Sequence, residues 1–375
     1  MLGNIATGSS RPRRVLFPIF VLMLLFHSTL AHGQVAVKVN DNVNFRFGAQ
    51  FQAWADELQD PATKAYAQNL FLRRIRFLLT GQVAPNVTFF FQTDNPNLGK
   101  TPKALGSGFI IQDAWFEWKL RDEFMIDGGE FLVPLCRADL ISTLSFITLD
   151  ISPTATVFAG PTQTNGLRDL GFQAKGYLFD GGRLEYRAAI FQGVRDAATS
   201  TTVSSRNAFR HSGYVQWDFW EKERGYVYPG TNFGKRKVLA ISSGYDGQKD
   251  YKAYSAALHT TVPVMKTNEV AVLLEGVHYD GGNFLKAIPR QNDYLGEFGY
   301  YMAPLKMQPF VKFEDQKFGV SSNPSKDVKR FGAGLNYYVS GQNLKLTGQY
   351  LRVTPDNHAI RSSNEFTVQF QIWYY

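Results

Sequence analysis

Basic side chains at alternating positions are the residues of this sequence with the most evident chemistry. Arg74 and Arg76 flank Ile75 in the segment LFLRRIRFLL, in which residues 74–77 alternate between basic and apolar. A guanidinium stays charged at physiological pH and can bind two oxygens of a phosphate or carboxylate. A series of such side chains along one surface could therefore attract and guide small anions. The basic residues that we select as a candidate anion pathway are Arg74, Arg76, Arg137, Lys175, Arg187, Arg206 and Arg210.

A second interpretation of these basic residues stays open. Several of them could simply pair with acidic neighbours such as Asp113, Asp169 and Glu185. In that case they would stiffen the structure instead of contacting a solute.

Residues suited to bond-breaking chemistry are sparse. The sequence contains neither a G-x-S-x-G nor an H-E-x-x-H motif. Ser255 and His259 share one face of a predicted strand, but a serine and a histidine two rungs apart on a polar surface are common by chance. Cys136 is the single cysteine, so it can form neither an intramolecular disulfide nor a cysteine metal cluster. We predict no enzymatic activity, no cofactor and no metal site.

The elements that carry the basic residues are predicted to be β-strands. In the segment 43–53 apolar residues occupy the odd positions and mostly polar residues the even positions. This period of two persists for longer than the five or six residues that are usual in soluble strands. The predicted strands are 43–54, 69–83, 87–94, 109–119, 123–133, 168–179, 182–193, 206–219, 236–246, 250–262, 268–280, 290–302, 306–318, 327–340, 343–354 and 363–375.

The connections between these strands alternate in length. Short connections such as 84–86 and 180–181 interleave with long ones such as 95–108 and 134–167. Short turns on one rim and long loops on the other are typical of a barrel that spans a bacterial outer membrane. Two connections break the pattern and have no explanation in the sequence: 220–235 is long where a short turn is expected, and 247–249 is short where a loop is expected.

Strand length and charge together predict how the barrel sits in a membrane. About 9–11 residues suffice for a tilted strand to cross a bilayer. An arginine facing lipid near the bilayer centre costs about 2–4 kcal/mol, so the apolar faces should point outward and Arg74 and Arg76 into a wet lumen. The same alternation places Arg73 on the outward face. The expected fold class is therefore all-β, a closed transmembrane antiparallel β-barrel of about 16 strands.

The connection 134–167 is the predicted constriction. It is the longest connection, it follows the fifth predicted strand, and it is partly apolar. Such a segment is expected to pack against something, and folding inward it would narrow a lumen that 16 strands leave open. The alternative is a flap outside the barrel.

The chain begins with a predicted secretory signal peptide, 1–33. An apolar run from Val15 to Phe26 follows three arginines, contains a proline and is too short to span a bilayer. Removing the leader lowers the formal net charge from +8 to +5 and leaves 34–375 as the barrel. A charge this small does not suggest a nucleic-acid partner.

Four segments in order carry a resemblance to a known family. They are LRRIRFLLTGQV; QDAWFEWKL followed by GGEFLVPL; RDLGFQAKGYLFDGGRLEYRAAIFQG; and FGAGLNYYVSGQNLKLTGQYLRV with the aromatic ending. They resemble a double-arginine second strand, the start of the constriction loop, the next hairpin and the last strands of the phosphate-selective porin O and P family. The resemblance implies a sixteen-stranded, usually trimeric outer-membrane porin whose pore favours anions.

The sequence also departs from that family. Leu132 stands where the family commonly has a lysine, and Arg137 is the only basic residue of the long loop. The outward alternation of the last strand falls on Tyr374, so the aromatic terminal signal is shifted by one residue from Tyr375.

We therefore expect passive diffusion of small solutes, with a preference for phosphate or other small anions, across the bacterial outer membrane. The expected partners are outer-membrane lipid, small anions and two further copies of the chain. A non-selective or plugged barrel that serves adhesion or as a scaffold is the alternative, and an outer-membrane enzyme is a more distant one.

Overall fold

The computed structural model describes residues 35–375 except 101–104, 106–107, 196–207 and 320–325. The strands are β1 Val35–Lys38, β2 Asn44–Gln59, β3 Tyr66–Ala84, β4 Val87–Asp94, β5 Ile110–Arg121, β6 Phe124–Leu132, β7 Arg168–Leu178, β8 Leu184–Phe191, β9 Arg210–Asp218, β10 Val238–Gln248, β11 Tyr251–Val264, β12 Asn268–Asp280, β13 Gln291–Tyr301, β14 Met307–Phe318, β15 Val328–Gln342, β16 Leu344–Pro355 and β17 Ser363–Tyr374. Helical structure in the described chain is limited to the short α1, Ala159–Thr162, and 3-10 turns at Ala138–Leu140 and Ala303–Leu305. None of these helices is long and apolar enough to cross a membrane.

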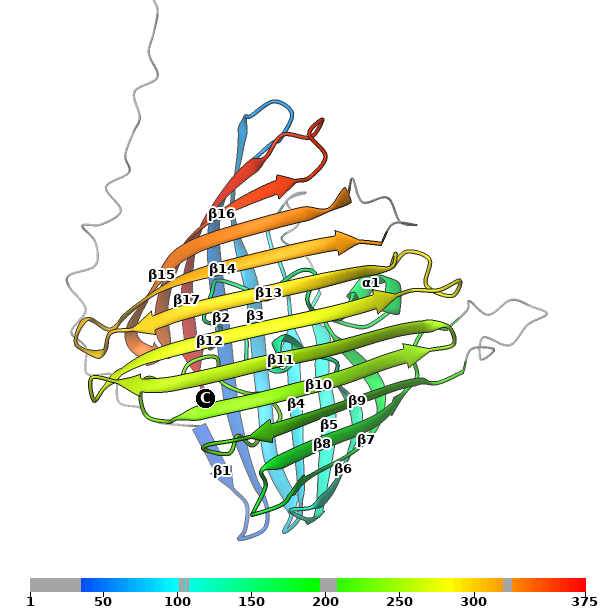
Figure 1. Cartoon of the computed structure of the whole chain (residues 1–375). Helices are drawn as coiled ribbons and strands as arrows, with labels where there is room; N and C mark the ends of the chain where they lie inside the picture. Colours follow the sequence, from blue (N-terminus) through cyan, green and yellow to red (C-terminus); the bar gives the residue numbers. More distant parts are fainter. Residues whose placement is uncertain (1–34, 101–104, 106–107, 196–207, 320–325) are drawn as a thin grey trace, which may run out of the picture. The chain divides into compact units, whose positions relative to one another are not determined.

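The strands β2 to β17 form a closed antiparallel barrel of sixteen strands (Figure 1). Each strand pairs with the next along the chain, and β17 pairs back with β2. The short β1 pairs with the start of β2, and β17 pairs with the rest of the same edge. The first and the last strand of the described chain therefore both lie beside β2. The predicted fold class is confirmed, and all sixteen predicted strands are present; β1 was not predicted.

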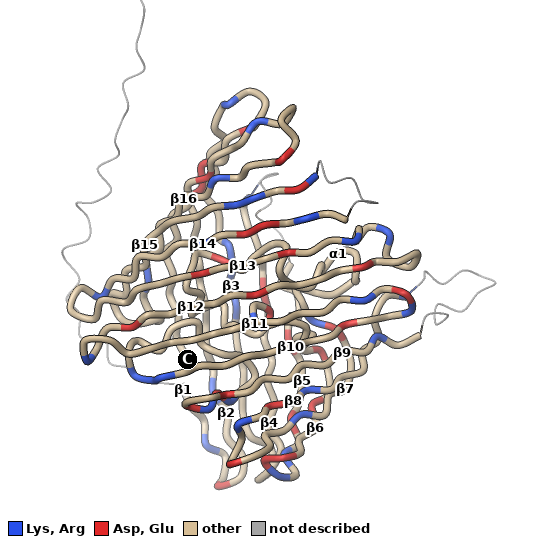
Figure 2. Tube along the Cα trace, viewed as in Figure 1, with Lys and Arg blue, Asp and Glu red and all other residues tan. Residues whose placement is uncertain are grey.

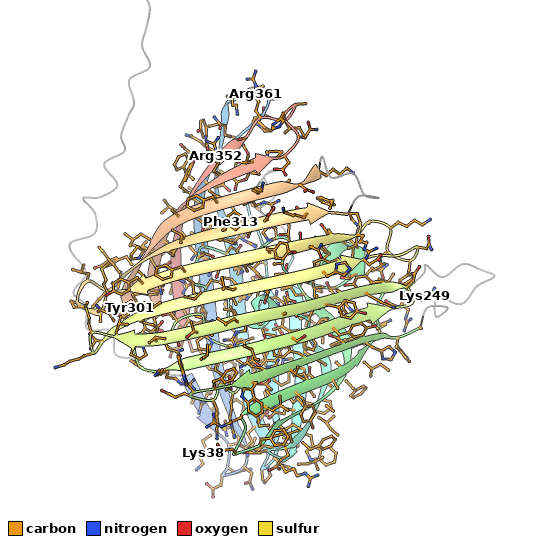
Figure 3. The ribbon with its side chains drawn as sticks, in the orientation of Figure 1. Lys38, Lys249, Tyr301, Phe313, Arg352 and Arg361 are labelled. Carbon is orange, nitrogen blue, oxygen red and sulfur yellow. The ribbon has the colours of Figure 1, made fainter. Side chains whose placement is uncertain are left out.

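Alternation along the strands separates an apolar outer face from a polar inner face. Phe313, which is labelled in Figure 3, is 45% exposed, and Phe77 is 48% exposed. Gln50 and Arg76 point inward and are almost fully buried. Charged residues recur along the strands as well as in the connections (Figure 2). The outer surface therefore matches lipid, whereas the inner wall can hold polar groups.

The long third loop, 133–167, folds into the lumen, as predicted for 134–167. Its backbone carbonyls accept hydrogen bonds from the inner wall. Ser255 Oγ on β11 donates to Leu135 O at 2.7 Å, and Asn336 Nδ2 on β15 donates to Ile147 O at 2.8 Å. A Cβ on Gly244 of β10 would come within 1.8 Å of Leu135 O, so only glycine permits this contact.

The loop packs against one half of the wall through apolar side chains. Val133 and Leu135 of the loop are fully buried in a cluster with Ala253, Leu273 and Leu295 on β11 to β13. These side chains are shielded from solvent, and we call this half of the interior the dry half. The space left for solvent lies on the opposite side, along β2 to β5.

The connection 219–237, for which the sequence offered no explanation, also folds inward. Its Tyr228 is fully buried and exchanges backbone hydrogen bonds with the third loop, donating to Leu140 O at 2.7 Å and accepting from Ser142 N at 2.9 Å. Gly230 N donates to Ser145 Oγ at 3.0 Å. This connection leaves the rim of short turns and meets the third loop inside the barrel, which is why it is long.

Candidate functional site: the passage along β2 to β5

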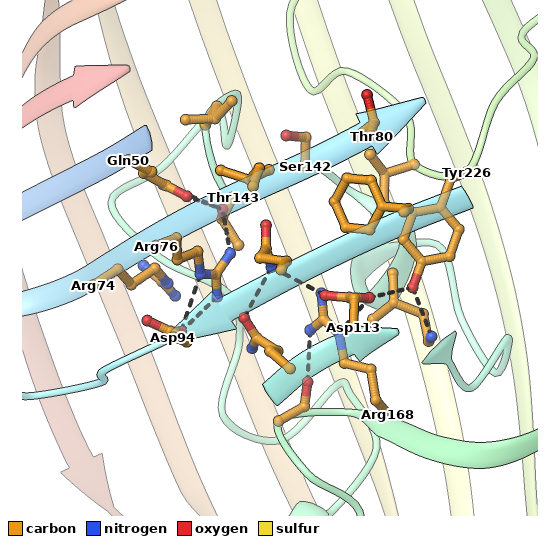
Figure 4. A pocket seen from close by; sticks show the side chains of 18 of the residues that line it. Gln50, Arg74, Arg76, Thr80, Asp94, Asp113, Ser142, Thr143, Arg168 and Tyr226 are labelled. Atoms are coloured by element: carbon orange, nitrogen blue, oxygen red, sulfur yellow. Dashed lines mark hydrogen bonds and ion pairs between the residues drawn. The ribbon is translucent and has the colours of Figure 1, made fainter. Parts of the chain in front are cut away.

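A cavity of about 820 Å³ lies between the inner face of β2 to β5 and the two inward-folded segments. It extends from Arg46 and Tyr375 near the short-turn rim to Arg73 and Pro96 near the long-loop rim. Figure 4 shows its middle, where Arg74 and Arg76 face Thr143 of the third loop. We call this cavity the passage.

Five arginines line the passage. Three carboxylates line it as well, from Asp94, Asp113 and Asp139. Arg74 and Arg76 belong to the predicted anion pathway. The three arginines that we did not select are Arg46, Arg73 and Arg168.

Arg73 and Arg74 share a single carboxylate. Both bind Asp150 of the third loop, with N–O distances of 2.9 and 2.6 Å. Burial by itself would raise the pKa of Asp150, but the two guanidiniums outweigh it and hold this pKa well below its ordinary value. Asp150 therefore stays ionised, and two positive charges face one negative charge.

The expected outward position of Arg73 is wrong. The register between β2 and β3 shifts so that Gln52 pairs with Arg74 and Ala53 with Leu72, which leaves Arg73 as the extra residue of a β-bulge. A bulge redirects side chains and breaks simple alternation. Arg73 thereby reaches Asp150 of the third loop.

The remaining paired arginines of the passage each have their own carboxylate. Arg76 binds Asp94 at 2.9 Å and donates to Thr143 Oγ1 at 3.0 Å. Arg168 binds Asp113 at 3.1 Å, and the Tyr226 hydroxyl donates to the same carboxylate at 2.6 Å. These pairs fix the guanidiniums against the wall (Figure 4).

Arg46 differs from the other four arginines. Its side chain is exposed to the passage, and no carboxylate of the described residues lies within 4.0 Å of it. It lies near the short-turn rim, on β2.

Four other residues of the predicted pathway lie away from the passage. Arg137 binds Glu223 at 2.6 Å, Arg187 binds Glu185 at 2.7 Å, and Arg210 binds Asp246 at 2.5 Å. Lys175 binds Glu117 and Asp127 at 2.6 and 3.1 Å. All four are at most 3% exposed, so the structure places them in buried ion pairs of the kind that the second interpretation describes.

The remaining predicted pathway residue, Arg206, lies outside the described residues. Within the described chain, no group of three or more His, Cys, Asp or Glu residues is arranged to hold a metal ion.

Comparison with known proteins shows that solved outer-membrane porins have a similar fold. An anion-selective porin from Comamonas acidovorans superposes with a TM-score of 0.60 at 14% identity, over 88% of this chain and 100% of that one. OprB of Pseudomonas putida superposes with a TM-score of 0.64 at 8% identity, over 88% and 94%. The trimer form of OmpT of Vibrio cholerae gives 0.54 at 9%, over 89% and 100%.

These identities are low, so the comparisons define the fold alone. No family model matches the sequence, and no curated protein does either. The resemblance to the phosphate-selective porin O and P family thus rests on the four sequence segments.

Proposed function

We propose that the protein is an outer-membrane porin that lets small solutes diffuse passively and prefers anions. The observation that carries this proposal is the charge of the passage. Arg73 and Arg74 share one carboxylate, and Arg46 has none among the described residues. A narrow path with low-dielectric walls and a surplus of positive charge raises the local concentration of anions.

The passage would select by width and charge without any bond chemistry. The third loop narrows the lumen, and the arginines present donors that suit phosphate and carboxylate oxygens. The carboxylates that already pair with Arg74, Arg76 and Arg168 weaken the hold of each guanidinium on a solute. An anion can therefore bind and leave, as conduction requires.

Reversal potentials in planar bilayers test the proposal. In a gradient of KCl we expect the purified protein to pass chloride in preference to potassium. The double substitution Arg74→Glu and Arg76→Glu should move the reversal potential toward cation preference. Arg290→Glu is the matched control, because Arg290 lies in an outer loop with its side chain 63% exposed. An unchanged reversal potential in the double variant would refute the role of Arg74 and Arg76.

A plugged barrel is the second candidate, and the two segments that fold into the interior favour it. The third loop and the connection 219–237 are joined by the buried Arg137–Glu223 pair and together fill much of the interior. Single-channel conductance separates the candidates. Discrete conductance steps would support a pore, whereas their absence in correctly folded protein would support adhesion or a scaffold.

Location, assembly and the permeating anion are parts of the same proposal. We infer that 1–33 is a cleaved leader and that 34–375 resides in the bacterial outer membrane; fractionation and the mass of the mature protein would check this.

The apolar outer face suits lipid, and a trimer form of OmpT has been solved, which supports a homotrimer. Phosphate is the anion that the family resemblance implies, and currents in phosphate and chloride would compare the two.

A further inference from the structure

Phe90, Trp115 and Tyr226 are among the aromatic residues that line the passage. Phe90 on β4 and Trp115 on β5 are directly paired across the two strands, with ring centroids 5.8 Å apart. Tyr226, from the inward-folded connection, covers both at 4.6 Å from Trp115 and 5.9 Å from Phe90. We call these three residues the ring cluster.

Phe90 and Trp115 are less buried than some of the other aromatic residues inside the barrel. Phe131, Phe191 and Tyr279 are at most 1% exposed because the third loop packs over them. Phe90 and Trp115 are only partly buried, although they lie on the inner face of the wall. Apolar surface that faces water is unfavourable, so a solute with an apolar body would gain by covering these rings.

The unpaired Arg46 lies on the same level of the wall as the ring cluster. Arg46 pairs in register with Thr80, Thr80 with Phe90, and Phe90 with Trp115. Adjacent strands are about 4.7–4.9 Å apart, so the Cα atoms of Arg46 and Phe90 are separated by about 10 Å. A small organic anion can bridge a gap of this size with its charged group at one end and its apolar body at the other.

We propose that Arg46 and the ring cluster form a subsite for organic carboxylates with an aromatic or flat apolar body. The carboxylate binds the Arg46 guanidinium, and the body of the solute packs against Phe90 and Trp115. An inorganic anion can use the arginines but gains nothing from the rings. The subsite rests on the proposed porin function and names the class of solute that the passage favours.

Block of the chloride current tests the subsite, with benzoate as the aromatic probe and acetate as the small one. Because ring contacts typically contribute about 0.5–1.5 kcal/mol, we expect benzoate to half-block at a concentration up to about tenfold lower than acetate. Trp115→Ala and Phe90→Leu should each raise the half-blocking concentration of benzoate and leave that of acetate unchanged. Arg46→Gln should weaken block by both anions.

Each variant is first checked by circular dichroism for the β-structure of the unmodified protein, which shows that the barrel is folded. Phe313→Ala is the control, because this ring lies on the outer face at 45% exposure and should not affect block. Equal block of the unmodified protein by benzoate and acetate would overturn the subsite. So would a benzoate preference that survives in both conductance-competent ring variants. If the unmodified protein showed no anion preference in KCl, the proposed porin selectivity would be refuted instead. The reversal potential in KCl and the block by benzoate therefore test the porin function and the subsite separately.

Discussion

Most inward-facing arginines of the described residues pair with a carboxylate, and the pairing decides which of them can contact a solute. Alternation along a strand indicates the face on which a side chain lies, and it placed Arg74 and Arg76 inward. It cannot indicate the partner, because the partners come from distant parts of the chain. Asp150, which pairs with Arg74, lies on the third loop, and Glu223, which pairs with Arg137, lies beyond the ninth strand.

At the residue scale, Asp139 gives a pH prediction. Burial raises the pKa of this loop carboxyl to about 7; hydrogen bonds from Cys136 and Val157 oppose the shift, and Asp246 adds to it. The Glu275 carboxylate of β12 is also near Asp139, because it accepts a hydrogen bond from the backbone N–H of the preceding residue, Ala138. As pH rises through 7, Asp139 gains a negative charge at the edge of the passage. Anion preference should therefore be greater at pH 6 than at pH 8.

Asp139→Asn should abolish this pH dependence while retaining the preference seen at pH 6. Reversal potentials measured at both pH values would check it, with Glu275→Gln as the comparison. A pH dependence that persists in Asp139→Asn and disappears in Glu275→Gln would assign the titration to β12 instead.

Among the elements, the connection 219–237 is the one whose inward fold could not be predicted from the sequence. Its length broke the alternation of short turns and long loops, but no local pattern showed that it folds inward. Its fold depends on hydrogen bonds with the third loop and with Glu269 on β12. Likewise, the β-bulge that turns Arg73 inward depends on the pairing with β2 and not on the sequence of β3 alone.

Gly230 tests the contact between the two inward-folded segments. A Cβ at this position would come within 2.3 Å of Ser145 O, a backbone atom that cannot rotate away. Gly230→Ala should therefore push the connection away from the third loop and alter the conductance or its noise. Gly348→Ala is the control, because a Cβ there meets nothing within 4 Å. Identical single-channel recordings for Gly230→Ala and the unmodified protein would contradict the packing described here.

The Arg137–Glu223 pair holds the same two segments together in a fully buried position. Arg137→Ala leaves the Glu223 carboxylate buried without its partner, which typically costs about 3–5 kcal/mol. Arg224→Ala in the same connection removes an exposed pair with Asp122 and should cost much less, because solvent screens exposed charges. Free energies of unfolding from lipid vesicles would compare the two variants. Equal losses would show that the buried pair has no special role.

At the scale of the whole barrel, the sequence predicted the sixteen strands, the outward apolar face and the inward third loop. These features follow from a period of two and from the lengths of connections, which are local properties. The division of the interior into a dry half and a passage could not be predicted. It depends on which part of the wall the apolar residues of the third loop contact. Leu273 and Leu295 belong to the apolar cluster under this loop because the closed barrel places them opposite it.

Reaction of single cysteines with a charged thiol reagent tests this division of the interior. In a Cys136→Ser background, Ser142→Cys places a thiol on the passage, and Ser255→Cys places one under the third loop, where Ser255 is 6% exposed. A negatively charged methanethiosulfonate should reduce the current through the Ser142→Cys variant and leave the Ser255→Cys variant unaffected. Rapid modification of Ser255→Cys with no effect on Ser142→Cys would contradict this division, because solutes would then travel through the half of the interior that the third loop covers.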